Sequence, residues 1–201
     1  MRIRTRVVCV IGLLVSLLLL TGCFFNVFET ARSIGKGKSS LAVALAAMNI
    51  QIEDTASWLL TPQARLAVGL TDNLELGLRS GLMVGVATGN VGFLGAVGDL
   101  KVTLFEEPQS FALALGFGGG YSSGLVGWGL EGSIYFDSTV PFFPLYFVYR
   151  PLLPLGVTDL ALIHQFAVGL HLELSPNARL LAELCSWGGI LSGGIGFDVS
   201  F

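Results

Sequence analysis

Many of the charged side chains in this sequence stand at every second position of otherwise apolar stretches. Only 12% of the 201 residues are charged, while 53% are hydrophobic. Charges that alternate with leucine, valine and phenylalanine gather on one face of a sheet, where acids and bases can pair. The positions concerned are Arg65, Glu75, Arg79, Asp99, Lys101, Glu131, His171, Glu173, Arg179, Glu183 and Asp198. We predict an ion-paired network at these positions, or alternatively the lining of a narrow polar pore or small-ligand site.

The two histidines and Cys185 are the other side chains with reactive potential. His164 falls on the apolar face, and no serine follows it at short spacing on that face. His171 shares the polar face with Glu173, and we interpret it as a hydrogen-bonded packing residue. Cys185 is predicted to be inert, and these dispersed residues lack metal-ligand spacing. We therefore expect no catalysis, no metal and no cofactor.

The amino terminus has the layout of a secretory signal. Three arginines precede an apolar run at residues 7–20, and small residues follow. Residues 20–23, Leu-Thr-Gly-Cys, resemble the lipobox of bacterial lipoproteins. That resemblance implies removal of residues 1–22 and acylation of Cys23, and Phe24 in place of Asp implies sorting to the outer membrane. An ordinary signal peptide or an uncleaved anchor is the alternative.

The chain after the signal has the composition of a membrane protein without spanning helices. Its net charge is about −6, which argues against nucleic acid as a partner. Glycine, proline and charges interrupt every apolar stretch that could form a spanning helix. A chain that spans a membrane without helices must form a closed barrel.

Residues 63–83 contain the clearest unit of such a barrel. Leu66, Val68 and Leu70 precede a polar turn at residues 71–73, and Leu76 follows it among alternating polar residues. Alternation with period two on both sides of a short turn predicts a β-hairpin. Its second face mixes charges with glycine and alanine, as a narrow polar lumen requires.

Similar units fill the rest of the chain. We predict the other strands at about residues 39–48, 96–104, 111–118, 128–136, 141–150, 165–173, 179–184 and 191–201. Prolines interrupt the strand at 141–150, and proline cannot donate to a ladder. We place longer connections at 49–60, 85–93 and 151–159, and shorter ones, on the side of the chain ends, at 71–73, 106–109, 137–139 and 175–177. A further turn is expected at 186–190. Residues 23–38 are expected to form a lipidated periplasmic tether, and residues 39–201 the barrel.

From residue 39 onward the chain resembles the small outer-membrane β-barrels of bacteria. Phe197, Val199 and the terminal Phe201 are similar to the signal that the barrel assembly machinery recognises. The resemblance implies an all-β, antiparallel, up-and-down transmembrane barrel of about ten strands, with eight to twelve possible. It also implies outer-membrane lipids, the assembly machinery and the lipoprotein sorting machinery as partners, with both chain ends in the periplasm.

We therefore expect a lipid-anchored outer-membrane barrel with a structural, adhesive or narrow-pore role. A periplasmic lipocalin-like lipoprotein, with the apolar face inward around a hydrophobic ligand, is one alternative, because alternation does not say which face is inside. A membrane-embedded lipid-modifying enzyme is another, although no polar cluster at a barrel rim points to it.

Overall fold

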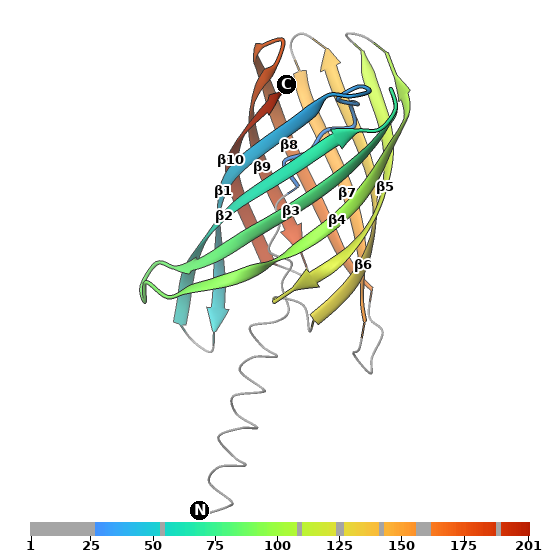
Figure 1. The fold of residues 1–201 in the computed structure, drawn as a ribbon. Helices are drawn as coiled ribbons and strands as arrows, with labels where there is room; N and C mark the ends of the chain where they lie inside the picture. Colours follow the sequence, from blue (N-terminus) through green and yellow to red (C-terminus); the bar gives the residue numbers. More distant parts are fainter. Residues whose placement is uncertain are drawn as a thin grey trace, which may run out of the picture.

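The computed structural model describes residues 27–52, 55–107, 110–123, 127–140, 143–155, 162–187 and 190–201, which form a closed barrel of ten antiparallel strands (Figure 1). The strands are β1 (Ser39–Ile52), β2 (Thr55–Gly69), β3 (Leu74–Gly85), β4 (Val91–Glu106), β5 (Phe111–Ser122), β6 (Gly127–Val140), β7 (Phe143–Pro154), β8 (Ile163–Ser175), β9 (Ala178–Trp187) and β10 (Ile190–Ser200). In the part of the chain that the structure describes, no helix is long and apolar enough to cross a membrane. The predicted fold class is confirmed.

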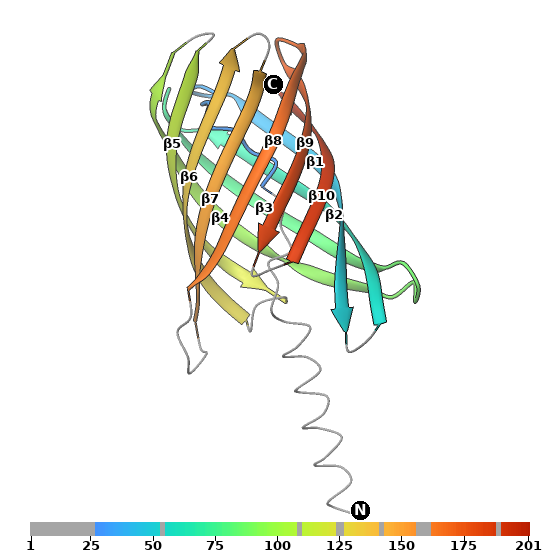
Figure 2. The ribbon, with the colours of Figure 1, turned by 180° about the vertical axis from the view of Figure 1, so that it is seen from behind.

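Each strand pairs with its neighbour in sequence, and β10 returns to β1 (Figure 2). In this last pair, Leu41 lies opposite Val199 and Val43 opposite Phe197. The amide of Phe201 donates to the carbonyl of Ser39, and the amide of Ser39 donates to the carbonyl of Phe201, both at 2.8 Å. Closure therefore uses the final residue of the chain and leaves no unpaired edge.

The connections fall at two ends of the barrel. The terminal end carries the start of β1, the end of β10 and the connections after β2, β4, β6 and β8. The loop end carries the connections after the odd-numbered strands. The turns predicted at residues 71–73, 106–109 and 175–177 correspond to terminal-end connections. The turn predicted at 137–139 is wrong, because β6 continues to Val140 and keeps Asp137 inside the barrel.

Of the connections predicted as long at the loop end, the one at residues 49–60 is mostly strand, and the one at 85–93 is a loop shortened to residues 86–90. β1 and β2 pair as far as Ile52 opposite Thr55, so the loop expected at residues 49–60 is short. The backbone ladder continues there although the side chains no longer alternate cleanly, because its hydrogen bonds do not depend on side-chain type. Likewise β3 ends at Gly85 and β4 begins at Val91, inside the loop predicted at 85–93.

The seventh strand also differs from its predicted bounds. It begins at Phe143 and ends at Pro154. Its last residues, 151–154, therefore lie in the part of the chain that was predicted to be a loop at 151–159. Its pairing with β6 is interrupted opposite Arg150 and Pro151 and resumes at Leu152. The strand tolerates proline because the ladder is already broken there.

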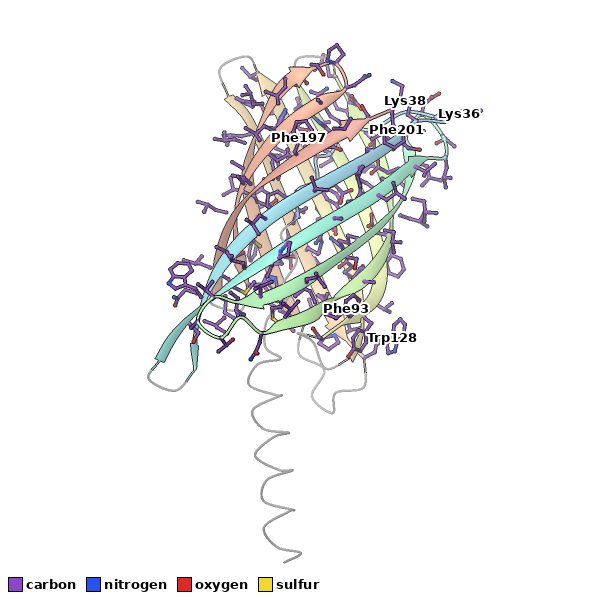
Figure 3. The ribbon with its side chains drawn as sticks, turned by 60° about the vertical axis from the view of Figure 1, so that its left-hand side comes forward. Lys36, Lys38, Phe93, Trp128, Phe197 and Phe201 are labelled. Carbon is purple, nitrogen blue, oxygen red and sulfur yellow. The ribbon has the colours of Figure 1, made fainter. Side chains whose placement is uncertain are left out.

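The two faces of the wall are chemically opposite. Leu76 and Leu115 point outward with 48% and 43% of their surface exposed, while Ala114 is fully buried. Figure 3 shows side chains projecting from the whole outer surface, with Phe93 and Trp128 towards one end and Phe201 near the other. The apolar face is therefore outside, which excludes the inverted, lipocalin-like arrangement for this fold.

Candidate functional site in the lumen

Ten of the eleven charged positions predicted from the alternation lie on the inner wall. They are Arg65, Glu75, Arg79, Asp99, Lys101, Glu131, His171, Arg179, Glu183 and Asp198. The eleventh, Glu173, is exposed close to the terminal end of β8, where the register with β9 shifts between Glu173 and Ser175. The prediction for Glu173 is therefore corrected: its side chain lies outside the network.

The largest cluster joins β2, β3 and β4. Arg65 Nη2 lies 2.9 Å from Glu75 Oε1 and 3.2 Å from Asp99 Oδ2. Lys101 Nζ lies 3.0 Å from the same oxygen of Glu75. All four side chains are buried, so each cation is matched by carboxylates where water is scarce. Gly77 makes this possible, because a Cβ atom there would lie 2.6 Å from Arg65 and 2.8 Å from Asp99.

A second cluster joins side chains of β3, β6 and β7. Arg79 pairs with Glu131, and Arg150 Nε lies 3.8 Å from the same carboxylate. The Arg150 side chain also donates to Ser133 Oγ at 3.1 Å. Arg150 is completely buried. It was missed because the predicted seventh strand ends at this residue, so the pattern assigns it to neither face.

Smaller pairs complete the wall. His171 Nε2 lies 2.9 Å from Asp137 Oδ1, so His171 is hydrogen-bonded inside the lumen. Arg179 pairs with Asp198 across β9 and β10. Asp137 was missed because its Asp-Ser-Thr context is typical of a turn, although it continues the odd-numbered inward face of β6.

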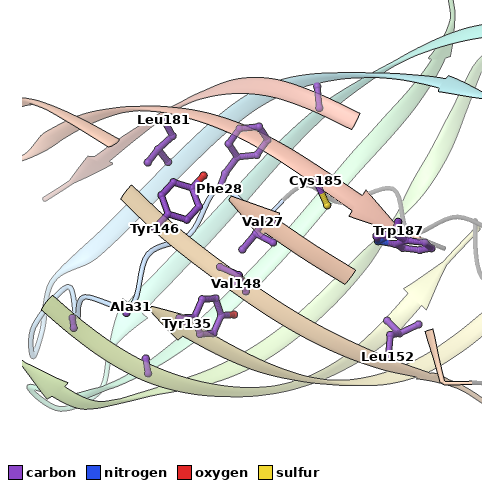
Figure 4. Packing of buried hydrophobic residues seen from close by; sticks show 14 residues of the cluster. Val27, Phe28, Ala31, Tyr135, Tyr146, Val148, Leu152, Leu181, Cys185 and Trp187 are labelled. Carbon is purple, nitrogen blue, oxygen red and sulfur yellow. The ribbon is translucent and has the colours of Figure 1, made fainter. Parts of the chain in front are cut away.

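The lumen is occupied by the chain itself. Residues 27–34, which we call the lumen segment, run inside the barrel, and Val27, Phe28 and Ala31 are among its buried residues. Figure 4 shows these three enclosed by strands, with Tyr146 close to Phe28. This differs from the prediction of a tether outside the barrel at residues 23–38, of which residues 23–26, including Cys23, lie outside the described residues.

Glu29 of the lumen segment joins the largest cluster. Its Oε1 lies 2.8 Å from Arg65 Nη2 and 3.3 Å from Lys101 Nζ. Its Oε2 accepts a hydrogen bond of 3.1 Å from the Tyr135 hydroxyl. Donors from β2, β4 and β6 therefore converge on one carboxylate that does not belong to the wall.

Glu183 of β9 makes the complementary contact. The backbone amides of Val27 and Phe28 donate to its two carboxylate oxygens at 2.6 and 2.8 Å. The Tyr146 hydroxyl donates to Glu183 Oε2 at 2.8 Å. A wall carboxylate thus holds the segment's backbone, while wall donors hold the segment's carboxylate.

Little space remains beside the segment. Two cavities along it measure about 20 and 10 Å³. Each is large enough for about one water molecule. The wall next to the segment is lined partly by small residues, including Ala42, Ala44 and Gly196, and a Cβ atom on Gly196 would lie 3.0 Å from the Phe28 ring. This run of small residues was the signal in the sequence that something else fills the lumen.

The remaining candidates for chemistry are held in ordinary contacts. His164 is exposed on the outer face, and its Nδ1 lies 2.8 Å from the Tyr149 hydroxyl. Cys185 is buried, and Gln165 Nε2 lies 3.0 Å from its sulfur. Among the described residues there is no cluster of three or more His, Cys, Asp or Glu side chains that could hold a metal ion.

The predicted assembly residues lie at the closing seam. Phe197 and Phe201 are exposed on the outer face, and Val199 is partly exposed. All three belong to the end of the chain that pairs with the first strand.

Comparisons with known proteins identify the fold. No protein-family model matches the chain, and no curated protein matches it significantly. Among solved structures, an outer-membrane channel from Pseudomonas putida F1 is similar with a TM-score of 0.52 and 10% identity, over 85% of this chain and 98% of that one. The KdgM porin matches with a TM-score of 0.43 and 11% identity, over 81% of this chain and 99% of that one. Neisserial surface protein A matches with a TM-score of 0.42 and 12% identity, over 83% and 98%.

Proposed function

We propose that this protein is a lipid-anchored barrel of the bacterial outer membrane, with a structural role and without catalytic activity. The observation that carries the proposal is the outward-facing apolar surface around a closed ten-strand wall. Such a surface in water would expose a large contiguous apolar patch, whereas in lipid it is matched to its surroundings. The similarity in fold to an outer-membrane channel supports the same location.

The filled lumen favours a structural role over a permanently open pore. Among the described residues, two cavities beside the lumen segment measure about 20 and 10 Å³, and each has room for about one water molecule. An adhesive role has less support, because the longest connection between strands at the loop end spans only residues 155–162.

The orientation follows from the even number of strands. With ten strands, the start of β1 and the end of β10 lie at the same end, which is the periplasmic one in bacterial single-chain barrels. The loop end then faces the cell exterior. The exposed Lys36 and Lys38 lie at the terminal end, beside Phe201 (Figure 3).

Lipid attachment at Cys23 is part of the proposal, and it constrains the lumen segment. Cys23 precedes Val27 by four residues, and an extended chain covers at most about 14 Å over that length. An acylated Cys23 and a seated lumen segment therefore require the anchor to lie within about 14 Å of Val27. Mass spectrometry of the mature protein should find Cys23 as the acylated amino-terminal residue, and an unmodified Cys23 contradicts this part of the proposal.

Extraction and spin labelling test the membrane assignment. The Cys23→Ala variant should still need detergent for release from membranes, because the wall itself is embedded. Spin labels at Leu76 and Leu115 should be accessible to oxygen and shielded from a water-soluble relaxing agent, while a label at the exposed terminal-end residue Glu173 should show the reverse. Release of Cys23→Ala in soluble form, or water access at Leu76 and Leu115, would overturn the proposal.

A narrow pore is the second candidate function. It is favoured by one observation: the segment that fills the lumen is held by polar side-chain contacts and is not a strand of the wall.

A further inference from the structure

Two glycines join the lumen segment to the barrel. Gly35 and Gly37 lie between it and β1, with φ of 85° and 72°, in the left-handed region that glycine adopts without steric cost. The amide of Gly37 donates to the carbonyl of Gly69 at 2.9 Å. A Cβ atom on Gly69 would collide with the Gly35 carbonyl, so the β2 backbone also needs glycine there. Residues 35–38 therefore fix the segment's exit at the terminal end.

Side chains of the wall hold the segment's backbone along its length. Lys101 Nζ donates to the carbonyls of Thr30 and Arg32 at 2.8 and 3.1 Å. Thr103 Oγ1 donates to the carbonyl of Ala31 at 2.9 Å. These contacts resemble those of a bound peptide more than those of a sheet, where backbone pairs with backbone.

The two carboxylate contacts give the bound segment its specificity. Glu29 fits a receptor made of Arg65, Lys101 and Tyr135. Immediately before Glu29 in the chain, the amides of Val27 and Phe28 both donate to Glu183, and Phe28 takes a φ of 42° to present them. Successive amides arranged in this way form an anion-binding concavity, and the left-handed φ is unfavourable for phenylalanine unless such contacts compensate.

We propose that the lumen wall is a binding site for an extended peptide that carries a carboxylate, and that residues 27–34 are its tethered occupant, whose release opens the barrel to ions. The inference rests on the proposed function only in requiring a barrel that spans a membrane. When the segment leaves, the space along Ala42, Ala44 and Gly196 becomes a water-filled path lined by the charged wall. The occupied site is the closed state of the pore.

The first test uses the mature full-length chain in planar bilayers. Glu29→Gln keeps the size of the side chain but removes the charge that Arg65 and Lys101 bind. Because hydrogen bonds to charged groups are strong, channel openings should become roughly tenfold or more as frequent as in the unchanged protein. Glu173→Gln, at an exposed carboxylate outside the lumen, is the matched control and should leave the opening frequency unchanged.

A free peptide then separates specific binding from general loosening. The peptide VFETARSI, which copies residues 27–34, should close the Glu29→Gln channel when added to the bath. The peptide VFQTARSI should block it roughly tenfold more weakly, because it lacks the carboxylate. Equal block by both peptides, or no block by either, contradicts a carboxylate-binding site.

A cysteine pair tests the same movement by tying the segment to the wall. The Ala31 carbonyl accepts a hydrogen bond of 2.9 Å from Thr103 Oγ1, so the two residues are neighbours, and a disulfide between Ala31→Cys and Thr103→Cys would tie the segment to β4. The chain also carries Cys23→Ala and Cys185→Ser, so that the introduced pair is the one oxidised. Combined with Glu29→Gln, the oxidised pair should remain closed and the reduced pair should open. Openings that do not depend on oxidation would overturn the proposal.

Failure of this inference is distinguishable from failure of the proposed function. A chain that does not float with lipid vesicles contradicts the membrane barrel itself. A chain that floats with vesicles while Glu29→Gln conducts no more than the unchanged protein contradicts only the release of the lumen segment.

Discussion

The outer face and the lumen of this barrel are separated by a wall one residue thick. Compared with a water-soluble protein, the polarity of the two faces is reversed, because apolar side chains are exposed and charged side chains are buried. On β3, Leu76 and Leu78 are about half exposed, while Glu75 and Arg79, which flank them, are buried. Outside, any apolar side chain of suitable size satisfies the environment, because lipid has no hydrogen bonds to offer. Inside, each charge needs a particular partner at a particular distance. The outer face is therefore specified by a pattern, and the lumen by individual contacts.

The largest effect is expected where both faces depend on closure. Deleting residues 199–201 removes the mutual hydrogen bonds of Ser39 and Phe201 and the pairing of Leu41 with Val199. Without closure the barrel has an open edge and no inside, so assembly into membranes should be lost while secretion and lipidation continue. Protease digestion of isolated envelopes should degrade the truncated chain, whereas Phe201→Leu, which keeps the backbone pairing, should remain protected. Protection of the truncated chain would mean that closure does not require the last strand's end.

The next largest effect tests the pattern on the outer face. Leu76→Arg and Leu115→Arg each place a charge on the predicted lipid surface, at a cost of about 2 to 4 kcal/mol in the free energy of unfolding near the bilayer midplane. Leu76→Val is the matched control and should cost little, because it keeps an apolar side chain. Urea unfolding in lipid vesicles gives the difference. If both arginine variants match the unchanged protein, the outer face does not meet lipid.

A smaller effect is expected inside, where shape rather than charge is disturbed. The Tyr146 ring lies directly over Gly169, so that a Cβ atom there would overlap it. Gly169→Ala must displace a ring whose hydroxyl supports Glu183, and overpacking of this kind costs about 1 to 3 kcal/mol. At Gly132 an added Cβ would meet Pro151 at 3.8 Å, an ordinary contact, so Gly132→Ala is the matched control. If the two variants have equal free energies of unfolding, the Tyr146 ring can move away from residue 169 without measurable cost.

The same difference explains what the sequence could predict. The outer face repeats leucine, valine and phenylalanine with period two, so strand existence, strand number and the inward position of Arg65, Glu75 and Asp99 followed from the pattern. Strand ends did not, because the ladder of β1 and β2 continues past the alternation to Ile52 and Thr55.

The contents of the lumen were less predictable. The position of Glu29 depends on a segment without periodicity that folds back into the barrel, and nothing local in its sequence marks it as buried. Asp137 and Arg150 were missed because turn residues and prolines nearby indicated strand ends. The alanines and glycines facing the lumen, such as Ala44 and Gly196, were interpreted as typical of a narrow polar lumen, whereas in the structure they leave room for the lumen segment.

The smallest expected effect lies at the rim, where lumen and solvent meet. Arg32 Nη1 lies 3.3 Å from Glu106 Oε1, and the Glu106 side chain is 34% exposed, so water and salt screen this pair. Glu106→Gln should lower the free energy of unfolding by less than about 1 kcal/mol, and added salt should reduce the difference further. Glu75→Gln, in the buried cluster with Arg65 and Lys101, is the matched comparison and should cost several times more, with little dependence on salt. Equal and equally salt-sensitive losses for the two variants would mean that water reaches Glu75 as freely as Glu106, and that the charges inside the barrel behave as a solvated surface.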